Sequence, residues 1–147
     1  EPDSFQREVV HNITKSPDID LVYGHHAHVP QPLDVVHGTW VAYGLGNFIA
    51  QQETDIPNTY RGVTVKFTFV EQPNGRFEVD KAQFLPTMIT PYEGGPMRVL
   101  DVPAALHNPK TPPALRPSLR AALASVRHDV YSLGARQDGL TMMGWSG

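Results

Sequence analysis

The chain has 147 residues, a hydrophobic fraction of 40% and a formal net charge of -3. It contains no cysteine, which excludes disulfide bridges and thiolate metal ligands. Its positive charges are scattered, so no nucleic-acid partner is expected, and no apolar run reaches the roughly 20 residues that a bilayer-spanning helix needs. The chain starts without Met, and we expect that an N-terminal portion precedes Glu1.

The first predicted element is a helix that begins after Asp3, whose side chain can form a capping box with Gln6. Phe5, Val9 and Ile13 recur every four residues and therefore share one face of this helix. Ser-Pro at 16–17 ends the helix, because the residue before a proline avoids the helical region.

A short apolar run at residues 20–23 follows at once and predicts a strand covered on both faces, as in a parallel sheet. A helix followed by such a strand is half of an α/β unit. Residues 24–28 then form the loop outside the carboxyl end of the strand, where open α/β sheets bind ligands.

Residues 33–36 and 40–43 predict two strands joined by a turn at His37 and Gly38, because a type I′ turn favours glycine second. A glycine-rich turn at 44–48 ends this hairpin, and residues 51–59 are expected to form an exposed loop.

Strict alternation of apolar residues at 63–69 predicts a half-buried strand, and a turn at 73–75 leads to its partner at 76–85. The apolar parity of the partner shifts, which predicts a β-bulge near Asp80 and Lys81.

The C-terminal part is rich in proline from 86 to 117, and we expect irregular surface chain there with one short strand near 97–102. Apolar spacing then predicts a second helix with Pro117 in its first turn and Gly134 at its end. Residues 137–147 are expected to form a loose tail. The fold class is therefore α/β, with α+β as the alternative: a mixed sheet with a few helices.

The strongest chemical signal is the loop with His25, His26 and His28. In an extended segment residues i and i+2 point the same way, so His26 and His28 can present two imidazoles to one metal. His25 is a third candidate ligand, although its parity directs it toward the core or a neighbouring loop. Gln31 could hydrogen-bond one of these histidine rings and orient it. The alternative is a surface histidine cluster without a role.

Two imidazoles do not complete a metal site, because a catalytic zinc usually has three protein ligands. Carboxylates near the loop are candidates by proximity alone, namely Asp18, Asp20, Asp34 and Glu53. We expect the remaining ligands upstream of Glu1. The other histidines have no comparable setting: His37 is interpreted as a turn residue and His128 as a residue near a helix C-terminus.

Residues 20–34, Asp-Leu-Val-Tyr-Gly-His-His-Ala-His-Val-Pro-Gln-Pro-Leu-Asp, and residues 41–48, Val-Ala-Tyr-Gly-Leu-Gly-Asn-Phe, resemble the poly-γ-glutamate capsule proteins of the CapA/PgsA type. In that family a Gly-x-His-x-His-Val segment precedes Tyr-Ser-Leu-Gly-Asn-Phe by about one hairpin. The resemblance is strong over residues 18–52 and weaker to residue 100. It places 1–105 in the C-terminal portion of a CapA-like domain and leaves 106–147 as a proline-rich connection, a helix and a tail.

The family is similar to calcineurin-like metallophosphoesterases, which implies a mixed β-sandwich flanked by helices and two divalent ions of Mn, Zn or Fe in the intact protein. The resemblance implies that His26 and His28 are metal ligands, one on each of the two ions, and that Gly24 lets the chain turn into the site. It further implies that Gly46 supplies unusual dihedrals and Asn47 a polar anchor; side-chain amides commonly satisfy turn backbone, which favours a structural role for Asn47.

The chain departs from these patterns in two ways. Gly44 stands where the capsule family usually has serine, and a strict phosphoesterase Gly-His-x-His reading from Gly24 would put Ala27 in the second ligand position. The upstream Asp-x-His, Gly-Asp and Gly-Asn-His motifs of phosphoesterases are absent from the sequence. The chain alone is therefore not expected to catalyse two-metal hydrolysis, and its catalytic residues are unknown.

The resemblance implies a role in capsule synthesis or export at the cell envelope or outside the cell. It also implies metal-assisted hydrolysis of a phosphoester or a γ-glutamyl amide, with an anionic polymer as substrate. The alternatives are a non-catalytic binding or scaffold subunit and a structural domain with incidental histidines. The expected partners are the N-terminal portion of the same protein and, through an exposed sheet edge, a second copy of the chain.

Overall fold

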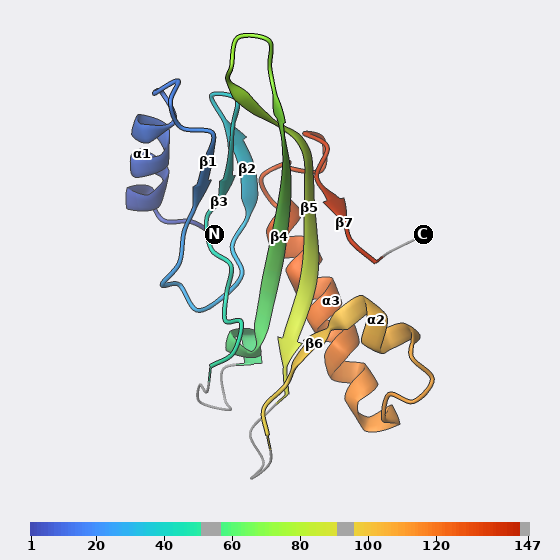
Figure 1. The fold of residues 1–147 in the computed structure, drawn as a ribbon. Helices are drawn as coiled ribbons and strands as arrows, with labels where there is room; N and C mark the ends of the chain where they lie inside the picture. The colour runs from blue at the N-terminus through green and yellow to red at the C-terminus, as the bar shows by residue number, and fades with distance from the viewer. Residues whose placement is uncertain (51–56, 91–95, 145–147) are drawn as a thin grey trace.

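The structure, a computed structural model, describes residues 1–50, 57–90 and 96–144. It contains two β-sheets, with one helix beside the first sheet and two helices against the second (Figure 1). The helices and strands are α1 (Ser4–Ile13), β1 (Leu21–Tyr23), β2 (Leu33–Val36), β3 (Thr39–Ala42), β4 (Arg61–Glu71), β5 (Phe77–Ile89), β6 (Val99–Asp101), α2 (Val102–His107), α3 (Arg116–Tyr131) and β7 (Thr141–Met142). The mixed α/β class predicted from the sequence is confirmed.

Helix α1 begins where the capping box predicts. The Gln6 backbone N–H donates to Asp3 Oδ1 at 2.7 Å, and the Asp3 N–H donates to Gln6 Oε1 at 3.0 Å. The two bonds satisfy backbone donors that a helix start leaves without intrahelical partners.

The buried face of α1 is not the one with the most apolar residues. Val10 packs against Val41 of β3 and against Tyr43, which follows that strand, and is 5% exposed. Phe5, Val9 and Ile13 do share a face, but they are among the exposed large hydrophobic residues. The helix therefore buries one stripe and leaves a second apolar stripe in contact with solvent.

The first sheet has the order β1-β3-β2, with β1 parallel and β2 antiparallel to β3. The turn between β2 and β3 has positive φ at His37 (51°) and Gly38 (86°), as a type I′ turn requires. Strand β1 is parallel to its neighbour, as expected, and both its faces are partly covered: Leu21 packs against the main core and Val22 against the cluster beside α1. Tyr23, at the end of the strand, is exposed.

The second sheet is built on the long β4–β5 hairpin, with β6 antiparallel and β7 parallel to β5. Thr68 pairs with Lys81 and Phe69 pairs with Val79, which leaves Asp80 as an extra residue in β5. The predicted β-bulge is confirmed at this position.

Helix α2 corrects the expectation of irregular chain between residues 86 and 117. Asp101 accepts a hydrogen bond from the Ala104 N–H at 2.8 Å, and Pro103 occupies a position in the first turn where its missing N–H costs nothing. Val102 and Pro103 are buried, so this short helix is part of the packed structure. Helix α3 has Pro117 in its first turn, and Gly134 follows its end with φ 96°, both as predicted.

The expectation of a loose C-terminal tail is also wrong. Leu140 is 2% exposed and lies in the main core, and β7 then pairs with Gln83 and Phe84 of β5. Of the loop expected at 51–59, residues 51–56 lie outside the described residues, while Thr59 is buried in a short 3₁₀ helix (Pro57–Tyr60).

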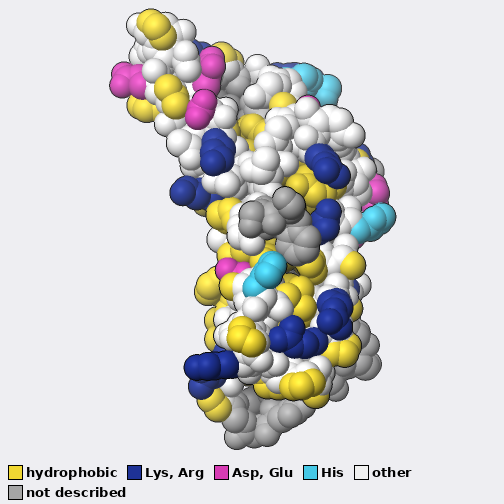
Figure 2. Space-filling view, turned by 90° about the vertical axis from the view of Figure 1, so that its right-hand side faces the viewer, with side chains coloured by type: hydrophobic (Ala, Val, Ile, Leu, Met, Phe, Trp, Pro, Cys, Tyr) yellow, Lys and Arg dark blue, Asp and Glu magenta, His cyan; other side chains and the backbone are white. Residues whose placement is uncertain are grey.

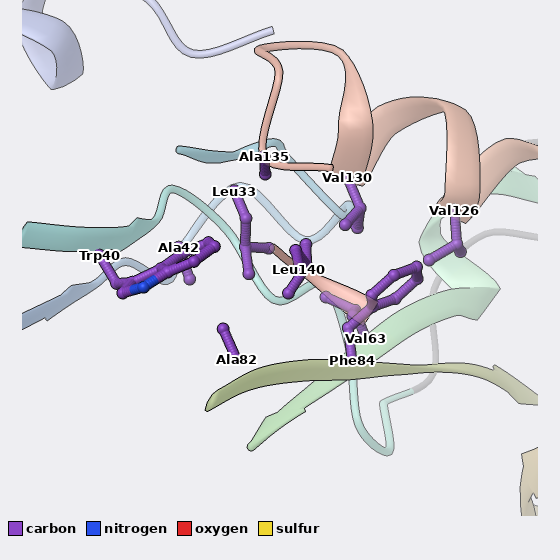
Figure 3. Packing of buried hydrophobic residues seen from close by; sticks show 10 residues of the cluster. All are labelled: Leu33, Trp40, Ala42, Val63, Ala82, Phe84, Val126, Val130, Ala135 and Leu140. Atoms are coloured by element: carbon purple, nitrogen blue, oxygen red, sulfur yellow. The ribbon is translucent and has the colours of Figure 1, made fainter. Parts of the chain in front are cut away.

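The main core lies where the two sheets and α3 meet (Figure 3). Its buried side chains come from β2 and β3, from β4 and β5, and from α3 and the segment after it: Leu33, Trp40, Ala42, Val63, Ala82, Phe84, Val126, Val130, Ala135 and Leu140. Full burial of a large apolar side chain of this kind contributes roughly 1.5–3 kcal/mol. The core therefore holds the first sheet, with its histidine loop, against the second.

The surface seen in Figure 2 carries Lys and Arg side chains spread among apolar and polar ones. Acidic side chains gather at the end where the β4–β5 hairpin turns. Among the described residues, no helix has the length and apolar character needed to cross a bilayer.

Candidate metal-binding site

The histidine loop leaves the carboxyl end of β1, beside the carboxyl end of the parallel strand β3. The Gly24 N–H donates to the Ala42 carbonyl at 2.8 Å, which extends the β1–β3 pairing into the loop. A Cβ on Gly24 would collide with the Tyr43 carbonyl oxygen. Gly24 has no positive φ, so it is needed for the close approach of two backbones and not for the turn that the family resemblance implies.

His26 and His28 lie side by side, but not by the route expected from an extended segment. Both have positive φ, 83° and 57°, so the loop bends sharply at each residue. The two ring centroids are 6.3 Å apart, with 50° between the ring planes, and both side chains are exposed. Two imidazoles on one tetrahedral metal, with metal–nitrogen distances near 2.1 Å, have ring centroids roughly 5 Å apart. The two rings would therefore have to approach each other by about 1 Å to share one ion.

One nitrogen of His28 is held by the glycine-rich turn at residues 44–48. His28 Nδ1 lies 2.8 Å from Asn47 Oδ1, and Asn47 Nδ2 donates to the Thr59 carbonyl at 2.9 Å. The carbonyl of Thr59 only accepts, so the amide orientation of Asn47 is fixed and its Oδ1 faces the histidine. An amide oxygen also only accepts, so His28 Nδ1 carries the proton and Nε2 has the free lone pair.

The turn with Asn47 lies between the two sheets. Leu45 is bridged to Pro30 on one side, and Gly46 is bridged to Gly62 of β4 on the other. Gly46 has φ 69°, which agrees with the unusual dihedral that the resemblance implies. Gly62 was not singled out in the sequence, yet a Cβ there would collide with the Asn47 carbonyl oxygen. A glycine at the start of a regular alternating strand was the signal that could have identified it.

Gln31 has another role than the one expected from the sequence. Its side-chain amide exchanges two hydrogen bonds with the Gln6 amide, at 2.9 and 3.2 Å, and it is 7% exposed. A Cβ on Gly44 would lie 2.7 Å from Gln31 Oε1, so the glycine leaves room for this side chain. Gln31 therefore ties the exit of the histidine loop to α1 instead of supporting a histidine ring.

His25 faces a different neighbour from the other two histidines. Its ring stands edge-on to Tyr23, with 5.7 Å between centroids. It also lines a pocket of about 250 Å³, together with Asn47, Phe48 and Val65. The structure therefore pairs His26 with His28 and places His25 against the end of β1.

The histidine loop lies in the part of the chain that is similar to known proteins. Residues 1–52 match the family described as bacterial capsule synthesis protein PGA_cap. The PGA biosynthesis protein CapA of Bacillus subtilis (strain 168) is 33% identical over 79 residues, which cover 54% of this chain and 20% of that relative. Both matches are thus to capsule synthesis proteins of the CapA type. No solved structure matches it significantly.

The family match covers α1, the first sheet and both segments that form the histidine site. The aligned part spans about one fifth of the length of the curated CapA relative. The His28–Asn47 hydrogen bond therefore lies within the part of the chain that carries the family relationship.

Among the residues that the structure describes, no group of three or more His, Cys, Asp or Glu side chains is placed to hold a metal. Asp18 and Asp20 precede β1 and so lie at the opposite end of that strand from the histidines. Asp34 lies on β2, where its Oδ1 accepts from the Val35 N–H at 2.9 Å. Glu53 lies outside the described residues. Within residues 1–50, 57–90 and 96–144, the His26–His28 pair therefore has no third candidate ligand beside it.

Burial raises the pKa of the Asp34 carboxyl above its usual value, and the nearby charge of Asp138 adds to this. The hydrogen bond from Val35 and the charge of Arg7 act in the opposite direction. The same burial effect raises the pKa of the Tyr43 hydroxyl, which Asp34 also influences. These groups belong to the packed interior of the first sheet and not to the histidine loop.

A second histidine pair is found where the sequence gave no reason to expect one. The rings of His11 and His37 have centroids 4.7 Å apart and are tilted by 57°. His37 Nδ1 lies 3.1 Å from the Thr14 hydroxyl, which itself donates to the Val10 carbonyl at 2.7 Å. The pair joins the end of α1 to the β2–β3 turn, so His37 is more than a turn residue.

Proposed function

We propose that the chain is part of a CapA-type capsule biosynthesis protein in which His26 and His28 bind a divalent metal ion. The observation that carries the proposal is the arrangement of the two rings. They lie side by side with 6.3 Å between centroids, exposed at the carboxyl ends of two parallel strands. One of them is oriented by a buried amide, since Asn47 is 7% exposed and accepts from His28 Nδ1.

The donor set suits a borderline divalent ion such as Zn, Mn or Fe. Neutral imidazole nitrogens bind these ions, and a metal-binding histidine commonly donates its other N–H to an oxygen acceptor. His28 meets this condition, because Asn47 Oδ1 takes the Nδ1 proton and leaves Nε2 for the ion. A bound ion would supply a water nucleophile of lowered pKa and polarise the bond to be cleaved. The protein residues would hold the ion and orient the rings.

We assign the metal ligands other than His26 and His28 to the N-terminal portion of the intact protein. Two-metal hydrolytic sites need carboxylate and further imidazole ligands, and the described residues place no third ligand beside His26 and His28. We assign two metals to the intact protein, a phosphoester or γ-glutamyl amide of an anionic polymer as substrate, and the cell envelope as location. The name of the CapA relative supports the link to PGA biosynthesis, and the metals, the substrate class and the location follow from the family resemblance of the two sequence segments.

Isothermal titration of Zn²⁺ and Mn²⁺ into the 147-residue chain tests the metal ligands. The double variant His26→Ala/His28→Ala is compared with His11→Ala/His37→Ala, which removes the other close histidine pair. We expect the first variant to lose the binding heat and the second to retain it. Side-chain NMR signals of His26 and His28 should shift with added Zn²⁺. Retained binding in the first variant, or loss only in the second, would refute the ligand assignment.

A second function is a metal-binding scaffold subunit without turnover. The observation that favours it is the incomplete ligand set among residues 1–50, 57–90 and 96–144. Hydrolysis assays with p-nitrophenyl phosphate and a γ-glutamyl amide, on a protein that includes the segment before Glu1, separate the two functions. Turnover that His26→Ala/His28→Ala abolishes supports the hydrolase, and metal binding without turnover supports the scaffold.

A further inference from the structure

Helix α1 carries two neighbouring stripes, which face different surroundings. Gln6, Val10 and Thr14 recur every four residues and face the first sheet. The second stripe is Phe5, Val9 and Ile13, which are 72%, 38% and 39% exposed. Adjacent residues of a helix are separated by about 100°, so the apolar stripe lies beside the packed one. A contiguous apolar stripe left in solvent beside a packed one is typical of a surface that another polypeptide covers.

The first sheet has a free edge at β1, beside α1 (Figure 1). Among the described residues β1 pairs only with β3. Gly24 directs its N–H to β3, and backbone groups alternate sides along a strand, so the N–H groups of Leu21 and Tyr23 face the free edge. Tyr23 is also 63% exposed. Strand β1 is short and runs parallel to its one neighbour, and its free edge can accept another strand.

The topology indicates which kind of strand fits this edge. Helix α1 leads into β1 through residues 14–20, which is the second half of a β-α-β unit. In such a unit the strand before the helix pairs in parallel with the strand after it, through a right-handed crossover. Strand β3 already occupies one side of β1. The strand that precedes α1 therefore has only the free edge of β1 available.

We propose that the stripe Phe5, Val9 and Ile13 and the free edge of β1 together form the docking surface for the polypeptide that precedes α1 in CapA-type proteins. That polypeptide supplies a strand parallel to β1 and an apolar surface against the stripe. The curated relative contains polypeptide beyond the aligned part, which is 20% of its length, and the topology of α1 and β1 assigns the occupant to the segment before α1. A second copy of the chain fits this edge less well. In a two-fold symmetric dimer the two copies of β1 would pair in an antiparallel direction, whereas the topology calls for a parallel strand. The proposal rests on the family relationship and not on the metal.

The test uses the polypeptide encoded directly before Glu1 in the same reading frame, produced separately and titrated onto the 147-residue chain. Val9→Asp is compared with Val70→Asp, a matched control on β4 whose valine is 44% exposed. We expect a complex whose dissociation constant rises at least tenfold in Val9→Asp and less than twofold in Val70→Asp. Hydrogen exchange of the Leu21 and Tyr23 amides should slow at least tenfold in the complex.

A second variant, Phe5→Ser, guards against a folding defect, because Phe5 is the most exposed residue of the stripe and circular dichroism can verify the helix. It should weaken the complex in the same way as Val9→Asp. Absence of an upstream coding segment, absence of a complex, or equal effects of Val9→Asp and Val70→Asp would each overturn the proposal. So would a homodimer, detected by light scattering, that Val9→Asp dissociates.

Discussion

His28 Nδ1 lies 2.8 Å from Asn47 Oδ1, although the two residues are 19 positions apart in the sequence. This bond joins the two segments that carry the CapA resemblance, the histidine loop and the glycine-rich turn. It also determines which ring nitrogen of His28 faces outward. The turn is therefore a support for the histidine, and its residues should affect the site without contacting an ion themselves.

Asn47→Ala should change both the histidine and the fold. The Thr59 carbonyl and His28 Nδ1 would lose their partner, and the loss of one partner of a buried hydrogen bond costs roughly 1–3 kcal/mol. We expect the ¹⁵N signals of His28 to report loss of the single Nδ1–H tautomer, and Zn²⁺ affinity to fall about 10- to 100-fold. Asn12→Ala, at an exposed position of α1, is the control. Unchanged tautomer and affinity in Asn47→Ala would exclude the supporting role.

Gly24→Ala should destabilise the protein, because the added methyl group collides with the Tyr43 carbonyl oxygen. Overpacking of this kind costs roughly 1–3 kcal/mol. Thermal unfolding measures the change. Gly38→Ala is the control: its Cβ meets nothing within 4 Å, and it bears only the penalty of a positive φ, about 1–2 kcal/mol. If Gly24→Ala kept the parent melting temperature, the backbone contact at the start of the loop would be less tight than described.

Leu140→Ala tests whether the C-terminal segment belongs to the core. Leu140 is 2% exposed and packs with Leu33, Phe84 and Val130. Truncation of a buried leucine costs roughly 2–5 kcal/mol. Urea denaturation should show this loss, whereas Val70→Ala at an exposed site should change the unfolding free energy by less than about 0.5 kcal/mol. A small effect of Leu140→Ala would mean that the segment is dispensable.

Asp34→Asn should raise stability near neutral pH. Burial raises the pKa of Asp34 in the folded state, so the folded protein binds this proton more tightly than the unfolded chain. The stability that the group contributes is present below its unfolded pKa, about 3.9, and is lost as the pH rises through the folded pKa. Asparagine keeps the acceptor for the Val35 N–H but carries no charge.

The urea midpoint of Asp34→Asn should therefore exceed that of the parent at pH 7, and the difference should shrink toward about pH 3. Asp18→Asn makes the same chemical change at an exposed carboxylate and serves as the control. An Asp34→Asn midpoint below the parent value at pH 7 would contradict the direction of the pKa shift.

Local chemistry was enough to predict most of the elements. The capping box of α1, the type I′ turn at His37 and Gly38, and the bulge at Asp80 each depend on neighbouring residues, and each is confirmed. Helix α2 and strand β7 were missed because their stability comes from burial. Pro103 and Leu140 pack against elements that are distant in the sequence, and a local pattern carries no information about such contacts.

The sequence by itself determined that three histidines follow a strand in a CapA-like segment, because residue type and spacing are properties of the chain. Only the tertiary structure decided which histidines form a pair and what holds them. His26 and His28 meet through a bend with positive φ, and Asn47 reaches His28 because its turn is fixed between the two sheets. The physical reason is that ring position depends on backbone dihedrals and on contacts across the two sheets, and neither is encoded in a spacing of two residues.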